Sequence, residues 1–195
     1  NVTGVQTCAL PISAGGRVVA YLCDDDLWMP DHLDNLVAGL ADADFLHTLH
    51  VGVSPADIWQ VLPADIASPA IAGVMLTSTS NFFGPTVVGH TMDAYRALPR
   101  GWRPAPPDLQ TDLHMWRQFL DCAQVRKRTL PICDTLHFPS PLRTAMSAVE
   151  RERETAAFSE RVAAPGAGDW YGGRIRAALA ASAIAAGVER AGLRA

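Results

Sequence analysis

The most constraining feature of the sequence is a short apolar run that ends in three consecutive aspartates. Residues 17–23 read RVVAYLC, two glycines precede them, and Asp24, Asp25 and Asp26 follow. Such a run, bounded by glycines and acids, is typical of a buried β-strand. Adjacent carboxylates raise one another's pKa unless a cation compensates, and hard oxygen ligands suit Mg²⁺ or Mn²⁺. Because ligands of open α/β sheets bind at the carboxyl ends of strands, we expect a metal site here. A solvated acidic turn that caps the following helix is the simpler alternative.

The rest of the chain alternates strand-like runs with helical patterns. After Pro30, the apolar residues Leu33, Leu36, Val37 and Leu40 recur at helical spacing and predict an amphipathic helix. Further strands are expected over residues 45–53, 74–79, 86–90 and 130–137, and further helices over residues 92–98 and 111–122. Beyond residue 143 the chain is rich in Arg, Glu and Ala, with a break at residues 165–173, which predicts two helices appended to an α/β body.

Composition excludes several classes of function. The 195 residues are 49% hydrophobic and 18% charged, which is typical of a globular chain of one domain with or without an appendage. A formal charge of -4 supplies no basic footprint, so we expect no nucleic-acid partner. No apolar run reaches the roughly 18 residues of a membrane span. Four cysteines without metal-site spacing fit a reducing compartment, so we expect a protein that is cytoplasmic, or peripheral at the inner face of a membrane.

The first residues are expected to be foreign to the protein. Residues 2–12 read VTGVQTCALPI, which matches the translation of a common sequencing-library adapter. The match predicts that residues 1–13 are an adapter-derived or disordered segment and that the natural polypeptide resumes near Ser13, so this segment carries no functional argument. An intact gene that encodes it would contradict this interpretation.

The acidic run lies in a longer stretch that resembles a known enzyme family. The sequence GGRVVAYLCDDDLWMPDHLDNLV resembles the core of the family 2 glycosyltransferases of the GT-A fold, whose pattern is roughly A-x-G-x-x-[IV]-x-[FY]-L-D-x-D-D-x-[WY]-x-P-x-x-L. Asp25, Asp26, Trp28, Pro30 and Leu33 match this pattern in register. The resemblance implies a GT-A fold, here partial, with a mixed sheet flanked by helices.

The resemblance also implies a metal site. In this family, one acid of the motif coordinates a Mn²⁺ or Mg²⁺ ion, and this ion bridges the diphosphate of the sugar donor. Asp25 takes the place of that acid. Asp24 and Asp26 are expected to bind the sugar donor. Cys23 replaces the first Asp of the pattern, which shifts the role of that residue to Asp24. A late histidine completes the metal site in many GT-A enzymes, and His137 in TLHFPS is the candidate here.

Two later segments resemble the acceptor side of the same family. GHTMDAYRALPRGW is similar to the pattern [VH]-H-R-x-x-x-x-x-x-G-G-W, and TDLHMWRQFL to E-D-x-D-L-W-L-R, with Thr111 in place of Glu. The second match implies that Asp112 is the catalytic base. His90, Trp102 and Trp116 are implied to shape the acceptor site. The alternatives are a role for Asp112 as an N-cap or as an acid of the first helical turn, and core packing for the two tryptophans.

The function implied is inverting, metal-dependent transfer of a sugar from a nucleotide-diphospho-sugar to a saccharide, lipid or other hydroxyl acceptor. The domains expected are a truncated GT-A domain over residues 14–142 and a helical C-terminal extension over residues 143–195. The strands S-V-[IV]-[IV]-P-[TA]-[YF]-N and V-[VI]-D-[DN]-[GA]-S, which recognise the nucleotide base in this family, do not occur. We therefore expect the chain as it stands to be inactive or very weak.

Two other functions remain open. Asp24 and Asp26 have the D-x-D spacing of haloacid-dehalogenase phosphatases, although the Gly and Thr that follow in that family are absent. A non-catalytic carbohydrate-binding or scaffold module of the transferase fold is favoured by Cys23 and Thr111, which replace acids.

Overall fold

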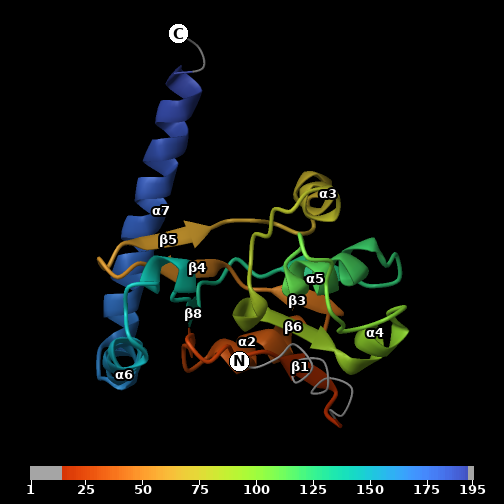
Figure 1. The fold of residues 1–195 in the computed structure, drawn as a ribbon, viewed down its shortest axis with the longest axis horizontal. Coiled ribbons are helices and arrows are strands. Elements are labelled where there is room, and N and C mark those ends of the chain that lie inside the picture. The colour runs from red at the N-terminus through yellow and green to blue at the C-terminus, as the bar shows by residue number, and fades with distance from the viewer. Residues whose placement is uncertain (1–14, 193–195) are drawn as a thin grey trace.

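The protein is an α/β body that carries two long C-terminal helices (Figure 1). The computed structural model describes residues 15–192, with side chains described through residue 183. The segment expected to derive from an adapter, residues 1–13, lies outside the described residues. The predicted α/β class, mixed sheet and C-terminal helices are confirmed.

A four-stranded mixed sheet forms the centre of the body. Its spatial order is β1 (Val18–Ala20), β6 (Val88–Thr91), β3 (Phe45–His47) and β7 (Lys127–Thr129). β6 is antiparallel to both β1 and β3, whereas β7 is parallel to β3. Among the described strands β1 lies at one edge, so the three aspartates follow an edge strand.

Two strands expected from sequence are each divided. The run 45–53 forms β3 and β4 (His50–Val53), because the backbone at residues 48 and 49 bonds to Val87 and Ile132 between them. The run 130–137 contains only β8 (Thr135–Leu136), since β7 ends before it and Pro131 has no N–H to donate. β8 pairs with β2 (Leu27–Trp28), and β4 with β5 (Trp59–Leu62).

Most helices lie where they are expected. α2 (His32–Gly39), α4 (Met92–Ala97) and α5 (Thr111–Asp121) match their predictions within a few residues. The prediction of a strand over residues 74–79 is wrong, because residues up to Thr77 belong to α3 (Pro69–Thr77). Pro69 at the start of α3 loses nothing by lacking an N–H there. Two short 3₁₀ helices, η1 (Pro85–Val87) and η2 (Ser140–Arg143), complete the body.

Helices cover both faces of the four-stranded sheet. Successive side chains of a strand point to opposite faces, so Phe45 and Leu46 of β3 enter different parts of the core. Phe45 stacks on Phe119 of α5 at 4.5 Å between ring centroids, whereas Leu46 packs with Leu36 of α2 and with Leu40, which follows that helix. The central strands are thereby held from both sides.

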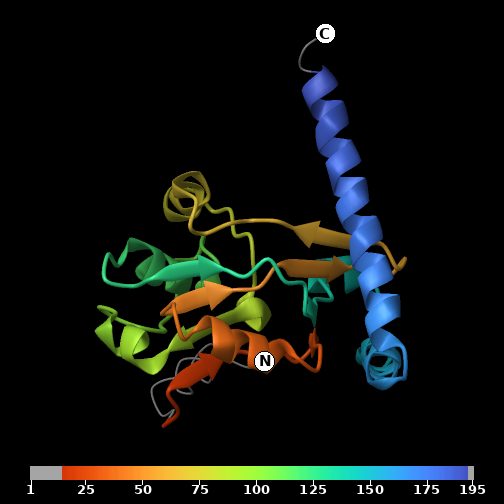
Figure 2. The same ribbon diagram turned by 180° about the vertical axis from the view of Figure 1, so that it is seen from behind.

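The C-terminal helices pack on the body through an apolar cluster of their own. α6 (Ala148–Ala163) begins with a capping box between Ser147 and Glu150 and is followed by α7 (Ala167–Gly192). Phe158 of α6 and Tyr171 of α7 pack around Trp59 of β5. Figures 1 and 2 show α7 against β5 at one end of the molecule, with its later turns projecting beyond the sheets. In the described part of the chain, no helix is both apolar and long enough to cross a membrane.

Candidate functional site

The acidic turn, Asp24 to Asp26, joins β1 to β2. β1 ends at Ala20, three residues before the expected end of the strand, and the turn is closed by the Asp26 N–H, which donates to the Cys23 carbonyl at 3.3 Å. Asp24 is exposed, Asp25 half-exposed and Asp26 buried. Burial raises the pKa of the Cys23 thiol to about 11, so this residue adds no negative charge to the turn near neutral pH.

Asp26 is held by three donors inside the protein. Its carboxylate accepts hydrogen bonds from the Thr86 hydroxyl, from His137 Nδ1 at 2.8 Å and from the Phe138 N–H at 3.2 Å. A buried carboxylate needs such partners, and Asp26 is only 5% exposed. Asp26 was expected to contact the nucleotide-sugar substrate. Its carboxylate oxygens instead accept hydrogen bonds from the protein, so Asp26 has a positioning role.

His137 follows β8 and lies partly open to solvent. Its Nδ1 contacts Asp26, which leaves Nε2 as the nitrogen that can bind a metal. The ring of His50 meets it edge to face at 4.6 Å between centroids. His137 was expected beside Asp25, but the carboxylate in contact with His137 is that of Asp26. Asp25 instead accepts a hydrogen bond from Ser140 Oγ at 2.9 Å.

The donor set fits a hard divalent cation. Asp24 and Asp25 line one cavity, and Mg²⁺ is usually held by one or two carboxylates together with substrate phosphates. Of the two ions, Mn²⁺ is less hard than Mg²⁺ and therefore accepts an imidazole nitrogen more readily. Within residues 15–192, no group of three or more His, Cys, Asp or Glu side chains is close enough to hold an ion by itself. The remaining ligands would have to come from substrate and water.

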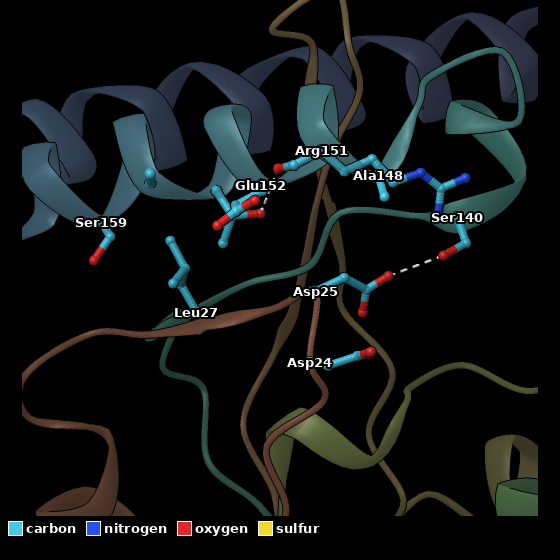
Figure 3. Close-up of a pocket in the computed structure, with 10 residues that line it drawn as sticks. Asp24, Asp25, Leu27, Ser140, Ala148, Arg151, Glu152 and Ser159 are labelled. Carbon is cyan, nitrogen blue, oxygen red and sulfur yellow. Dashed lines mark hydrogen bonds between the residues drawn. The ribbon is translucent and has the colours of Figure 1, made fainter. Parts of the chain in front are cut away.

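The cavity beside the acidic turn has a volume of about 630 Å³ (Figure 3). One wall comes from the body and the other from α6. Its lining residues are Asp24, Asp25, Leu27 and Ser140 from the body, and Ala148, Arg151, Glu152, Thr155, Ala156 and Ser159 from α6. A role for α6 could not be predicted from sequence, because a charged helical face has the same pattern whether it meets solvent or a cavity.

Asp112 lies in the first turn of α5 and is half-buried. Its carboxylate accepts hydrogen bonds from Asn81 Nδ2 and from the Leu113 N–H, each at 2.9 Å. Burial raises the pKa of the Asp112 carboxyl, while these two donors and the more distant charge of His137 oppose the rise. The residue before α5 that occupies the N-cap position is Gln110, so Asp112 is not the N-cap. Asn81 was not predicted.

The three residues expected on the acceptor side lie in the core. His90 and Trp116 have no exposed surface, and Trp102 is 5% exposed. His90 Nε2 and Trp102 Nε1 both bond to the hydroxyl of Tyr21, at 2.6 and 2.9 Å. Trp116 packs edge to face on Trp102 and Tyr21. This placement corrects the expectation, because side chains enclosed in this way pack the core and do not present a face to an acceptor.

Comparison with known proteins adds no assignment. A scan against models of protein families found no match to the chain, and a search of curated proteins found no similar sequence.

Proposed function

We propose that the chain provides the metal-binding and base residues of an inverting glycosyltransferase of the GT-A fold. The observation that carries the proposal is the contact of His137 with Asp26, which joins the acidic turn after β1 to the end of β8 across 111 positions of sequence. The family resemblance expects a late histidine to join this turn. The mixed sheet is compatible with the same fold.

Asp24 and Asp25 would hold Mn²⁺ or Mg²⁺ together with oxygen atoms of the substrate and water, because these two carboxylates and His137 do not by themselves form a group that could hold an ion. The bound cation would neutralise charge on the diphosphate that leaves a nucleotide-diphospho-sugar donor. Asp26 fixes the ring of His137 and the nitrogen that carries its proton, as carboxylates commonly do for metal-binding histidines. Ser140 orients the carboxylate of Asp25.

Asp112 would accept the proton of the attacking acceptor hydroxyl. The raised pKa of its carboxyl supports this role, because a base acts best when its pKa approaches the working pH. Asn81 orients the carboxylate of Asp112 through the hydrogen bond that its amide donates.

A non-catalytic carbohydrate-binding module is the second candidate. It is favoured by Cys23, whose neutral thiol replaces an acid of the family pattern. The phosphatase alternative has less support, since the second carboxylate of its D-x-D pair would be Asp26, which is buried and committed to three protein donors.

Binding of Mn²⁺ followed by nucleoside diphosphates separates these candidates. Free Mn²⁺ is measured by electron paramagnetic resonance with the 195-residue chain, and uridine and guanosine diphosphate are then titrated by calorimetry. The transferase proposal expects weak diphosphate binding that requires Mn²⁺ and is lost in Asp25→Asn, with Asp121→Asn on α5 as a control that retains it. Saccharide binding that is independent of Mn²⁺ and of Asp25 would favour the module, and absence of Mn²⁺ binding would overturn the transferase proposal.

A further inference from the structure

Helix α6 turns one continuous face toward the acidic turn. Its lining positions 148, 151, 152, 155 and 159 recur every three or four residues, which places them on one side of the helix. Figure 3 shows this face above Asp24 and Asp25, with the cavity between them. A volume of about 630 Å³ is within the size range of small-molecule sites, so the space can hold a substrate group.

Among the described residues that line this cavity, Arg151 is the only one with a cationic side chain. One of its terminal nitrogens, Nη2, donates to the carbonyl of Arg143 at 2.7 Å, which fixes the direction of the guanidinium. Figure 3 shows the side chain extending toward Ser140, which itself bonds to Asp25. No carboxylate of the described residues forms an ion pair with Arg151, so its other N–H groups are available to an anion.

The α6 wall is firmly attached to the body. Arg143, which is 2% exposed, forms a bidentate ion pair with Glu154 of α6. Its Nε lies 2.6 Å from Oε2 and its Nη2 lies 2.8 Å from Oε1. Phe158 enters the aromatic cluster formed by the two C-terminal helices and the β4–β5 hairpin. Arg151 is thus presented to the cavity by a helix held at several points.

The charges of the cavity favour a divalent cation and leave one guanidinium beside it. Asp24, Asp25 and Glu152 are three carboxylates against the one guanidinium of Arg151, which leaves two negative charges. One divalent cation balances them, and the guanidinium of Arg151, which has no ion-pair partner among the described residues, can then bind a phosphate group. Guanidinium groups bind phosphate through two parallel hydrogen bonds, which a lysine or a hydroxyl cannot supply.

We propose that α6 is the second wall of the substrate site and that Arg151 binds one phosphate of a diphosphate whose other phosphate reaches the cation at Asp24 and Asp25. This inference rests on the proposed function, and it assigns a binding residue to the part of the chain that the family resemblance does not cover. The substrate class is a metal-complexed diphosphate.

Inorganic pyrophosphate tests this assignment without requiring turnover or a nucleotide base. Calorimetric titration of the full chain in Mn²⁺ compares the wild type with Arg151→Gln and with Arg153→Gln, an exposed arginine of the same helix. We expect Arg151→Gln to weaken pyrophosphate binding by about tenfold to a hundredfold, as for loss of a charged hydrogen bond, with the affinity for Mn²⁺ alone and the melting temperature preserved. Arg153→Gln should match the wild type.

The outcomes separate the inference from the proposed function. If pyrophosphate binds and Asp25→Asn abolishes binding but Arg151→Gln does not, the role of Arg151 is overturned while the metal site stands. If neither Mn²⁺ nor pyrophosphate binds the wild type, the proposed function fails. Inorganic phosphate that binds as tightly as pyrophosphate would overturn the diphosphate assignment. If Arg151→Gln does not fold, Glu152→Gln decides, because removing a carboxylate from the same wall should tighten pyrophosphate binding severalfold and an unchanged affinity would overturn the proposal.

Discussion

Glu154 attaches helix α6 to the body, and its removal tests whether this helix is a structural part of the site. The Glu154→Ala variant leaves the guanidinium of Arg143 buried at 2% exposure without its carboxylate. Breaking a buried ion pair by removing one partner destabilises a protein by about 3–5 kcal/mol. Arg143 keeps its bond to the Val53 carbonyl at 2.9 Å, and Glu154 is 16% exposed, so we expect the lower end, about 3 kcal/mol.

Urea unfolding followed by circular dichroism measures this loss. For a chain of this length, about 3 kcal/mol corresponds to a fall in melting temperature of roughly 6–12 °C. Glu160→Ala, at an exposed position of the same helix, is the matched control and should change the free energy of unfolding by less than about 0.5 kcal/mol. Replacement of both partners, Arg143→Met with Glu154→Leu, should recover most of the loss, because no charge is then left buried. A loss below about 1 kcal/mol in Glu154→Ala would refute the reasoning.

Three further predictions concern the interior of the site and the core. The Asp26→Asn variant should lower the affinity for Mn²⁺ by about 10–100-fold, since the ring of His137 loses its carboxylate partner, and an unchanged Mn²⁺ titration would contradict this role. In a longer parent protein that carries the nucleotide-binding strands and transfers sugar, the Asp112→Asn variant should slow Mn²⁺-dependent transfer by about 10²–10⁴-fold while pyrophosphate binding stays intact, so equal rates for the two active proteins would remove Asp112 as the base. Burial lowers the pKa of His47 and His90 to about 4, so the unfolded chain binds more protons than the folded protein between pH 6.5 and 4, and stability should fall as the pH drops through this window. At pH 5 the loss should be roughly 2 kcal/mol for each histidine relative to pH 7, and urea unfolding that is equally stable at both pH values would exclude this effect.

Local signals explain which helices could be predicted. α4 begins where the side chain of Thr91 accepts a bond from the Ala94 N–H, and such caps are visible in sequence. The error at α3 has an equally local cause: a short apolar run is compatible with a buried strand or a helix, and only Met75 of this helix is buried. The two-residue strand β2 and the four-residue strand β5 were missed because strands this short are defined by the partner beside them.

For the candidate site too, individual residues could be named from the sequence, whereas their contacts could not. The acidic turn could be proposed as a site from its own chemistry, and His137 and Asp112 from the family resemblance. Their pairing could not, since Asp26 meets His137 only after β2 pairs with β8. The structure also distinguishes the metal-site candidate Asp25, which lines a cavity, from the acceptor-side candidate Trp116, which is completely buried.

Short-range chemistry in the chain is sufficient for the α/β class, the helical tail and the acidic turn. Those features depend on periodicity, capping and adjacent charges, which act over a few residues. The second wall of the cavity depends on long-range packing, because Arg151 faces Asp25 only when Glu154 pairs with Arg143 and Phe158 enters the aromatic cluster. A charged helix face has the same sequence pattern whether it meets water or a substrate, and the fold determines which of the two it meets.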